Sequence, residues 1–244
     1  MTRLRHCFLY YLSWLMFGLG GLLLNIACAP FLPWRRRRPV QRVARRAIRW
    51  MFEFWNRWIH ATRFIPIHWH NCQDGLAPAG SIIVANHPSL VDATWLLSRL
   101  PDTVCIFKRS LLRNPCIAPA ALLAGYIAGD LGIDTIRAAA EKLREGCSLL
   151  VFPEGTRTAR GVDLNPLRPG FALMAARAAA PVQIVRLELS DTLLPRYEPW
   201  WQVPRMPVTI NITRGPVLAP PRVTAAQAFA DEVARHLSPP QTNL

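Results

Sequence analysis

A long stretch without a charged residue lies near the start of the sequence and limits what the first part of the chain can form. From Cys7 to Trp34, 28 consecutive positions carry no Asp, Glu, Lys or Arg. A helix needs about 20 apolar residues to cross a bilayer, so this stretch is long enough. Ala27-Cys28-Ala29 resembles a signal-peptide cleavage site, but the arginines of residues 35–38 follow at once and argue against one. We therefore predict an uncleaved membrane anchor, which either spans the bilayer or forms a helix pair that enters one leaflet.

Much of the positive charge of the chain lies directly behind this stretch. The formal net charge is +14, and all basic residues except Lys108 and Lys142 are arginines. Cytoplasmic flanks of membrane segments are enriched in arginine and lysine. We therefore predict that the protein is bound to the inner (cytoplasmic) membrane with its bulk on the cytoplasmic side. Six scattered cysteines without a CxxC pair fit reduced thiols in that compartment.

The segment Val40–Phe64 has the spacing of an amphipathic helix. Its apolar residues recur every three or four positions, and its opposite face begins with Arg42, Arg45, Arg46 and Arg49. Such a helix suits the headgroup layer of a membrane. The plainer alternative is a helix packed on the domain with a solvated basic face. Because an anchor precedes these arginines, we predict membrane lipids and no nucleic acid as partners, and we assign residues 1–64 to a membrane anchor and amphipathic helix.

From Ile65 onward, short β-rich runs alternate with helical patterns. We predict strands at 65–70, 81–85, 103–107, 148–152, 182–189 and 208–213, and helices at 89–99, 133–145, 169–180 and 224–237. Such alternation is typical of α/β domains. The predicted fold class is therefore α/β, with a central, mostly mixed sheet flanked by helices over residues 65–237, preceded by the membrane-associated helical element. Residues 238–244 form a short tail.

The first cluster of polar residues that could take part in a reaction lies where a predicted strand ends. After that strand the chain continues Asn86-His87-Pro88, and Asp92 follows His87 in the first turn of a predicted helix. A carboxylate at that place reaches back to the imidazole and fixes its tautomer, so the other ring nitrogen can act as a base. Such a base can activate the hydroxyl of a bound substrate directly, so no enzyme nucleophile is needed. The alternative is a loop histidine whose hydrogen bonds are satisfied.

A second polar turn, Phe152-Pro-Glu-Gly-Thr-Arg157, follows the predicted strand at 148–152. Gly155 lets the backbone pass close to a ligand. Arg157 offers a planar fork for a phosphate or carboxylate, and Glu154 could hold Arg157 or bind acceptor hydroxyls. The alternative is a structural ion pair within a turn.

Together these stretches resemble motifs of the glycerolipid (lysophospholipid) acyltransferase superfamily, which includes the 1-acylglycerol-3-phosphate acyltransferases. Asn86–Asp92 resembles the family's H-x4-D motif, and Phe152–Arg157 is similar to its acceptor-binding motif. Lys108 matches a family lysine at a strand end, and the resemblance covers roughly residues 65–215. It implies a membrane-bound O-acyltransferase of phospholipid biosynthesis, with His87 as general base and Asp92 as its orienting acid. It also implies acceptor binding by Lys108, Glu154, Gly155, Thr156 and Arg157.

The resemblance also implies the substrates. It points to a fatty acyl group carried by acyl carrier protein or coenzyme A as co-substrate, a lysophospholipid-like acceptor, and no metal or other cofactor. Backbone N–H groups after Pro88, with Lys108, would stabilise the oxyanion. However, Leu131 stands where phosphate-selecting members carry an arginine, and Arg109-Ser110 replaces a usual acidic residue. A non-phosphate glycerol lipid or a polyketide lipid of the aryl-polyene type is therefore the alternative acceptor.

Two hypotheses from other classes stand beside the enzyme. A non-catalytic tether would bind anionic lipid through Arg35–Arg49, but it has no need for a paired His87 and Asp92. A metal site could use His68, His70 and Cys72, since alternate residues of a strand share a face. The sequence offers no fourth ligand to that set, so we predict no metal site.

Overall fold

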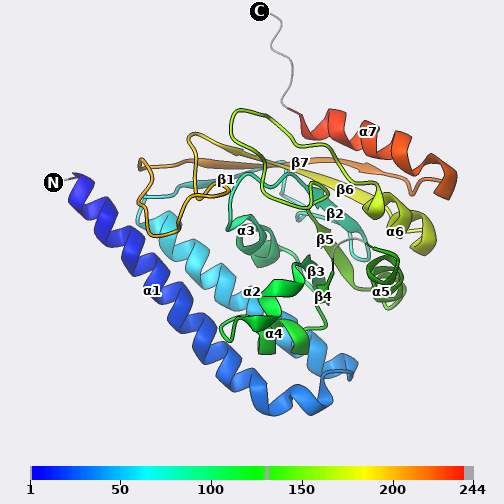
Figure 1. The fold of residues 1–244 in the computed structure, drawn as a ribbon, viewed down its shortest axis with the longest axis horizontal. Helices are drawn as coiled ribbons and strands as arrows, with labels where there is room; N and C mark the ends of the chain where they lie inside the picture. Colours follow the sequence, from blue (N-terminus) through cyan, green and yellow to red (C-terminus); the bar gives the residue numbers. More distant parts are fainter. Residues whose placement is uncertain (1, 130–131, 239–244) are drawn as a thin grey trace, which may run out of the picture.

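The computed structural model describes residues 2–129 and 132–238. A hairpin of two long helices lies along one side of an α/β domain, and the C-terminal helix lies at the opposite end of the molecule (Figure 1). The departure noted at Leu131 lies outside the described residues. So does the predicted tail at 238–244, apart from Ser238.

A seven-stranded sheet forms the centre of the domain. Its strands in chain order are β1 (Ile67–His70), β2 (Ile82–Ala85), β3 (Thr103–Phe107), β4 (Ile127–Ala128), β5 (Ser148–Val151), β6 (Val182–Leu189) and β7 (Ile210–Leu218). Their order across the sheet is β1-β7-β6-β2-β5-β3-β4, and the neighbours pair in parallel except β6 and β7. The predicted mixed sheet is therefore confirmed. The prediction missed β4, because two residues are too few to show an alternating pattern.

Helices cover both faces of this sheet. On the side of the helical hairpin lie α3 (Asp92–Arg99) and α4 (Ala118–Leu123), and on the other side lie α5 (Ile133–Arg144), α6 (Gly170–Ala178) and α7 (Ala226–Leu237). Short 3-10 turns complete the chain as η2 (Arg109–Arg113) and η3 (Val223–Ala225). In β2, Ile83 and Ala85 face the core beneath α2 (Arg38–Ala61) and α3, while Ile82 and Val84 face the core beneath α5, α6 and α7. Burial on both faces explains why β2 is apolar without interruption.

The N-terminal hairpin consists of α1 (Thr2–Cys28), the 3-10 turn η1 (Ala29–Trp34) and α2 (Arg38–Ala61). Within the described chain, Arg3–Trp34 is the stretch long and apolar enough to cross a membrane. Polar contacts nevertheless tie α1 to the rest of the protein. Trp55 Nε1 donates to Ser13 Oγ at 3.1 Å, and Asn25 Nδ2 donates to the Cys116 carbonyl at 2.7 Å. The helix therefore lies against the domain instead of projecting from it.

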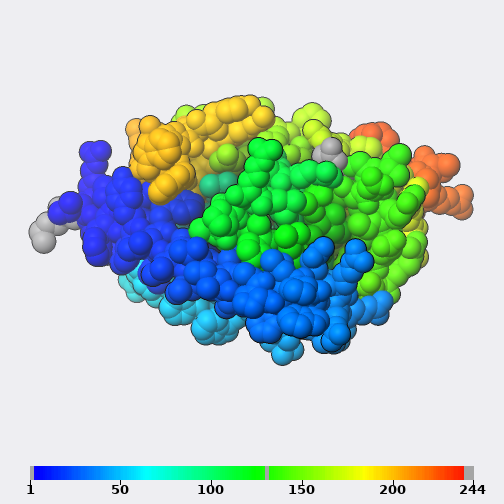
Figure 2. Space-filling model, turned by 60° about the horizontal axis from the view of Figure 1, so that its bottom comes forward, coloured from blue at the N-terminus to red at the C-terminus, as the bar shows by residue number. Residues whose placement is uncertain are grey.

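The side of α1 that faces away from the domain is apolar. Its side chains that are more than half exposed are Leu4, Phe8, Leu15, Leu19, Leu23 and Ile26. Trp50 and Phe54 add exposed aromatic rings on α2, and Figure 2 shows α1 and α2 side by side on this face of the molecule. An exposed apolar surface of this extent marks an interaction site.

The arginines of α2 do not form one solvated face, contrary to the simplest interpretation of the sequence. Arg45 is only 4% exposed, and its guanidinium donates to Asp102 Oδ1 at 2.7 Å and to the Ala124 carbonyl at 2.7 Å. Arg49 donates to the Ser98 carbonyl at 3.2 Å. Part of the basic charge therefore holds α2 on the domain, and the remainder faces solvent.

Candidate active site

The two polar turns identified in the sequence meet at one edge of the sheet. β2 and β5 are parallel neighbours with Val84 opposite Val151, so the residues after both strands emerge together. His87 and Glu154 each follow that pair by three positions. The His87 backbone N–H donates to Glu154 Oε1 at 2.8 Å, and the Thr158 N–H donates to the His87 carbonyl at 2.8 Å. The two turns are thus joined by hydrogen bonds.

His87 and Asp92 are in direct contact. His87 Nδ1 lies 2.8 Å from Asp92 Oδ2, and the Ser89 N–H donates to the same oxygen at 2.8 Å. The turn of residues 89–91 explains why α3 begins at Asp92, three residues later than predicted. When Nδ1–H donates to the carboxylate, Nε2 carries the free lone pair of the ring. The His87 side chain keeps 20% exposure while Asp92 is fully buried, which is the arrangement of an oriented general base.

The main side-chain partner of the buried Asp92 carboxylate is the His87 imidazole. Burial raises the pKa of Asp92, and the hydrogen bond with His87 opposes that rise. Oδ1 of Asp92 is buried and has no hydrogen-bond partner among the described residues. The negative charge of Asp92 is therefore available to stabilise an imidazolium formed when His87 takes up a proton.

Two of the backbone N–H groups after Pro88 are engaged within the turn. The Ser89 N–H donates to Asp92, and the Val91 N–H donates to Ser89 Oγ at 3.4 Å. The expected oxyanion site after Pro88 stays a prediction: the Leu90 N–H has no partner among the described residues, but the Ser89 and Val91 N–H groups are not free. The turn uses these donors to fix Asp92 instead.

Glu154 is buried and links the two turns by hydrogen bonds. Its Oε1 accepts the His87 N–H and the Thr158 hydroxyl, the latter at 3.0 Å, and its Oε2 accepts the Asn165 N–H at 2.9 Å. The side chain is 3% exposed. It does not hold Arg157, which the sequence had left open, because its described partners are these three donors. The position of His87 therefore depends on Glu154.

Arg157 turns toward a different loop. Its Nη1 donates to the carbonyls of Leu194 and Pro195 at 2.8 and 2.7 Å. Burial and, next, the nearby Arg196 lower the pKa of Arg157, while the charge of Asp92 acts in the opposite direction. One nitrogen of the guanidinium is thus used to hold this loop close to the site.

Two side chains that the sequence did not single out complete the turns. The Phe152 ring stacks on His87, with 4.2 Å between centroids and 21° between planes. Arg168 lies across Gly155: a Cβ added at Gly155 would be 3.2 Å from the Arg168 guanidinium carbon. Gly155 also has a φ of +68°, a left-handed conformation that favours glycine. Among the described residues the Arg168 guanidinium has no hydrogen-bond or ion-pair partner, so a cation lies beside the turn.

The remaining predicted site residues make no hydrogen bond to His87 within the described chain. Lys108 follows β3, which pairs with β5 on the side away from β2, and its side chain is exposed. Thr156 is partly buried in the same turn as Gly155. At the predicted alternative site, the His70 ring bonds Asn211 Oδ1 at 3.1 Å, and the described residues contain no cluster suited to a metal ion.

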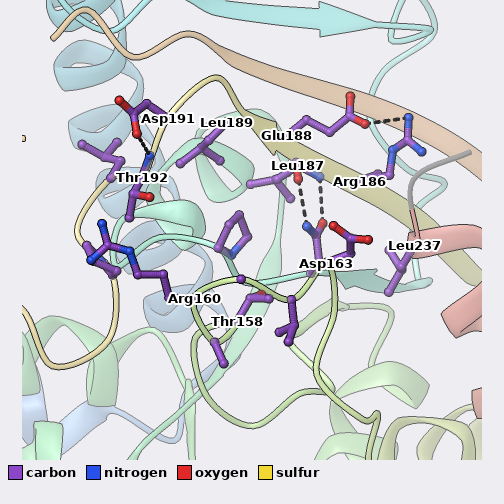
Figure 3. A pocket seen from close by; sticks show the side chains of 17 residues that line it. Thr158, Arg160, Asp163, Arg186, Leu187, Glu188, Leu189, Asp191, Thr192 and Leu237 are labelled. Carbon is purple, nitrogen blue, oxygen red and sulfur yellow. Dashed lines mark hydrogen bonds and ion pairs between the residues drawn. The ribbon is translucent and has the colours of Figure 1, made fainter. Parts of the chain in front are cut away.

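A cavity of about 490 Å³ borders the site (Figure 3). Asn86 and Pro88, which flank His87, contribute to its lining, whereas the His87 side chain does not. Part of its charged lining is neutralised, since Arg186 pairs with Glu188 at 3.0 Å. The cavity is therefore adjacent to the His87–Asp92 pair, not centred on it.

Comparisons with known proteins converge on one family. The acyltransferase family model matches residues 67–188, half of the chain and including both turns. The 1-acyl-sn-glycerol-3-phosphate acyltransferase of Cocos nucifera is 31% identical over 138 residues, or 54% of this chain and 44% of that protein. The enzyme of the same name from Helicobacter pylori is 32% identical over 108 residues, or 42% of this chain and 46% of that protein. The chain thus spans less than half the length of these curated relatives.

A solved structure shares the fold over a much larger part of the chain. The crystal structure of the 1-acyl-sn-glycerophosphate (LPA) acyltransferase PlsC from Thermotoga maritima superimposes with a TM-score of 0.67. The match covers 97% of both chains at 20% sequence identity. It therefore includes the N-terminal hairpin as well as the α/β domain.

Proposed function

Because the chain belongs to the acyltransferase family, we propose that it transfers a fatty acyl group from a thioester to a hydroxyl of a lysophospholipid-like acceptor at a membrane. The observation that carries this proposal is the 2.8 Å contact between His87 Nδ1 and Asp92 Oδ2. A braced imidazole with its second nitrogen free can remove the proton of an alcohol. The donor thioester is carried by acyl carrier protein or coenzyme A.

The proposed reaction has two steps. His87 Nε2 takes the proton of the acceptor hydroxyl while its oxygen attacks the thioester carbonyl, which forms a tetrahedral oxyanion. The intermediate then collapses, the carbon–sulfur bond breaks, and the leaving thiolate receives the proton from the imidazolium. Asp92 stabilises the imidazolium between the two steps and keeps the ring in the correct tautomer. No covalent acyl-enzyme forms along this route.

Arg168 is the cation that we assign to an acceptor phosphate. Its guanidinium lies against Gly155, next to Glu154, which holds the His87 backbone. A guanidinium without an internal partner is suited to bind two phosphate oxygens at once. Arg168 thereby supports a phosphate-bearing acceptor despite the absence of the arginine that Leu131 replaces. The alternative acceptor, an uncharged glycerol lipid or a polyketide lipid, would make no use of it.

The hairpin provides the proposed membrane attachment. One side of α1 is bonded to α2 through Ser13 and to the domain through Asn25, and its other side is apolar and exposed. A helix held along the domain in this way cannot cross the bilayer while the domain stays outside it. We therefore favour a protein whose α1 and α2 enter one leaflet, and the arginines around them support the cytoplasmic side of the inner membrane.

Acylation in a reconstituted system tests the proposal. The purified protein in phospholipid vesicles is given acyl carrier protein or coenzyme A thioesters with a panel of lysophospholipids, monoacylglycerols and hydroxylated polyketide acids, and products are identified by mass spectrometry. We expect a diacylated phospholipid from a lysophospholipid. Acylation of only the uncharged or polyketide acceptors would favour the alternative acceptor. No product from any acceptor, with vesicle binding intact, would favour the tether.

A further inference from the structure

A second cavity lies on the hairpin, away from the His87–Asp92 pair. It measures about 280 Å³ and lies between α2 and the residues that precede β3. We call it the arginine pocket, defined by its lining residues Arg42, Arg46, Arg49, Pro101 and Asp102. The proposed acyl transfer uses none of these side chains.

The charge of the arginine pocket is strongly unbalanced. Asp102 is its one carboxylate, and both oxygens are occupied: Oδ1 by Arg45 at 2.7 Å and Oδ2 by Arg42 at 3.2 Å. Arg49 bonds only a neutral carbonyl. Arg46 is exposed and has no hydrogen-bond or ion-pair partner within residues 2–129 and 132–238. Three guanidinium groups line the pocket and Arg45 adds a fourth beside it, whereas Asp102 supplies one negative charge. The pocket therefore attracts an anion.

An apolar surface borders the arginine pocket. Val43, Trp50 and Phe54 are 65%, 70% and 55% exposed, and the Trp50 and Phe54 rings stack at 6.2 Å. Arg46 lies in the same row, because residues three and four apart share one side of a helix. α1, whose outer side is also apolar and exposed, lies beside α2 (Figure 2). Charge and apolar surface thus meet at Arg46.

We propose that the arginine pocket binds the phosphate headgroup of an anionic membrane phospholipid whose acyl chains lie along Val43, Trp50 and Phe54. Arginine forks match phosphate oxygens, and aromatic residues favour the boundary between headgroups and acyl chains. Pockets for drug-sized ligands measure about 300–1,000 Å³, so about 280 Å³ suits a headgroup with its chains outside. A free phosphate would fill the pocket and leave the exposed aromatic rings uncovered.

Lipid retention in detergent tests this assignment independently of acyl transfer. The detergent-solubilised full chain is titrated with dioctanoyl phosphatidylglycerol, and bound lipid is counted by native mass spectrometry. We expect one retained lipid, and a loss of affinity of about 25-fold when Arg46 and Arg49 are both replaced by Gln, at about 5-fold for each arginine. His87→Ala should retain the lipid, so failure of the proposed enzyme function would leave this result standing.

A matched variant separates a site from diffuse attraction. Arg36→Gln with Arg37→Gln removes the same charge from exposed positions of the hairpin that do not line the pocket. It should change affinity by less than about 3-fold, because both side chains are exposed, do not line the pocket, and act on a bound lipid only through solvent and salt. Equal losses in both double variants, or no loss in either, would overturn the proposal. So would a pocket variant that retains lipid but loses binding of acyl carrier protein, which would make the pocket a protein-docking site.

Discussion

Replacing Glu154 by Gln tests whether this side chain braces His87 or binds the acceptor. The substitution keeps the size of the side chain and exchanges one carboxylate oxygen for an NH2 group. In the structure those two oxygens accept three hydrogen bonds, from the His87 N–H, the Thr158 hydroxyl and the Asn165 N–H. The amide of Gln can accept on one side only. At least one of these donors must therefore lose its partner.

The least costly orientation places the new NH2 group against the Asn165 N–H, since Glu154 Oε2 has that single donor. One hydrogen bond to a charged group, worth about 1.5–3 kcal/mol, is then lost, and a partly buried N–H is left unpaired at a further cost of at most about 1–3 kcal/mol. A decrease of about 3 kcal/mol in the free energy of unfolding follows. For a chain of this size that corresponds to a fall in Tm of about 6–12 °C. The turnover number should fall as well, because the His87 backbone is less firmly held.

Calorimetry and acceptor kinetics on the same preparations provide the assay. Glu198→Gln is the matched control, since this residue pairs with Arg160 at 2.9 Å at an exposed position and should cost less than about 1 kcal/mol. A Glu154→Gln protein with unchanged Tm and a selectively raised acceptor KM would refute the reasoning. It would assign Glu154 to acceptor binding, as the sequence resemblance implied.

Three further predictions follow from the site and the hairpin. Asp92→Asn should lower kcat by about 10³- to 10⁴-fold, because the amide favours the wrong imidazole tautomer. Since burial raises the pKa of Asp92, its contribution to stability is largest at acid pH and is lost as the pH rises through the folded-state pKa. Urea denaturation at several pH values should therefore show the Asn variant gaining stability relative to the native protein from acid to neutral pH, and the opposite trend would contradict the assignment. Arg168→Gln should raise the KM for 1-acylglycerol-3-phosphate by about 10- to 100-fold and leave that for monoacylglycerol unchanged, in contrast to Arg160→Gln. Equal effects on both acceptors would show that Arg168 is structural. Leu15→Ser with Leu19→Ser should weaken vesicle binding by about 100-fold or more in a flotation assay without lowering Tm, because both side chains are exposed in the folded protein; unchanged binding would exclude this face as the attachment surface.

The parts of the fold that the sequence predicted are those with a strong local signal. β3 and β6 were predicted with their observed bounds: β3 is a continuous apolar or β-branched run, and the second half of β6 alternates apolar with charged residues. His87 and Asp92 were placed at a strand end and a helix start, and their five-residue separation allowed the observed contact. The family resemblance, carried by the same residues, is confirmed by the family match.

The parts that the sequence did not predict depend on contacts between distant segments. The role of Glu154 became visible only when Asn165 and His87 were brought to it from two other parts of the chain. In the sequence Arg45 could not be distinguished from the exposed arginines around it. It is buried because it bonds Asp102, which lies 57 positions away. Arg168 had one signal that could have revealed it, namely the glycine at position 155, which leaves room for another side chain to approach. No local pattern encodes pairings of this kind.

The measurement that tests the central claim most directly is the initial rate of thiol release from an acyl thioester in the presence of the acceptor, compared between the native protein and His87→Ala. Both are assayed on the same vesicles, with circular dichroism and flotation showing that each is folded and membrane-bound. The oriented-base mechanism predicts that acceptor-dependent thiol release falls by about 10²- to 10⁴-fold in the variant. An unchanged rate from a folded, membrane-bound His87→Ala protein would contradict it.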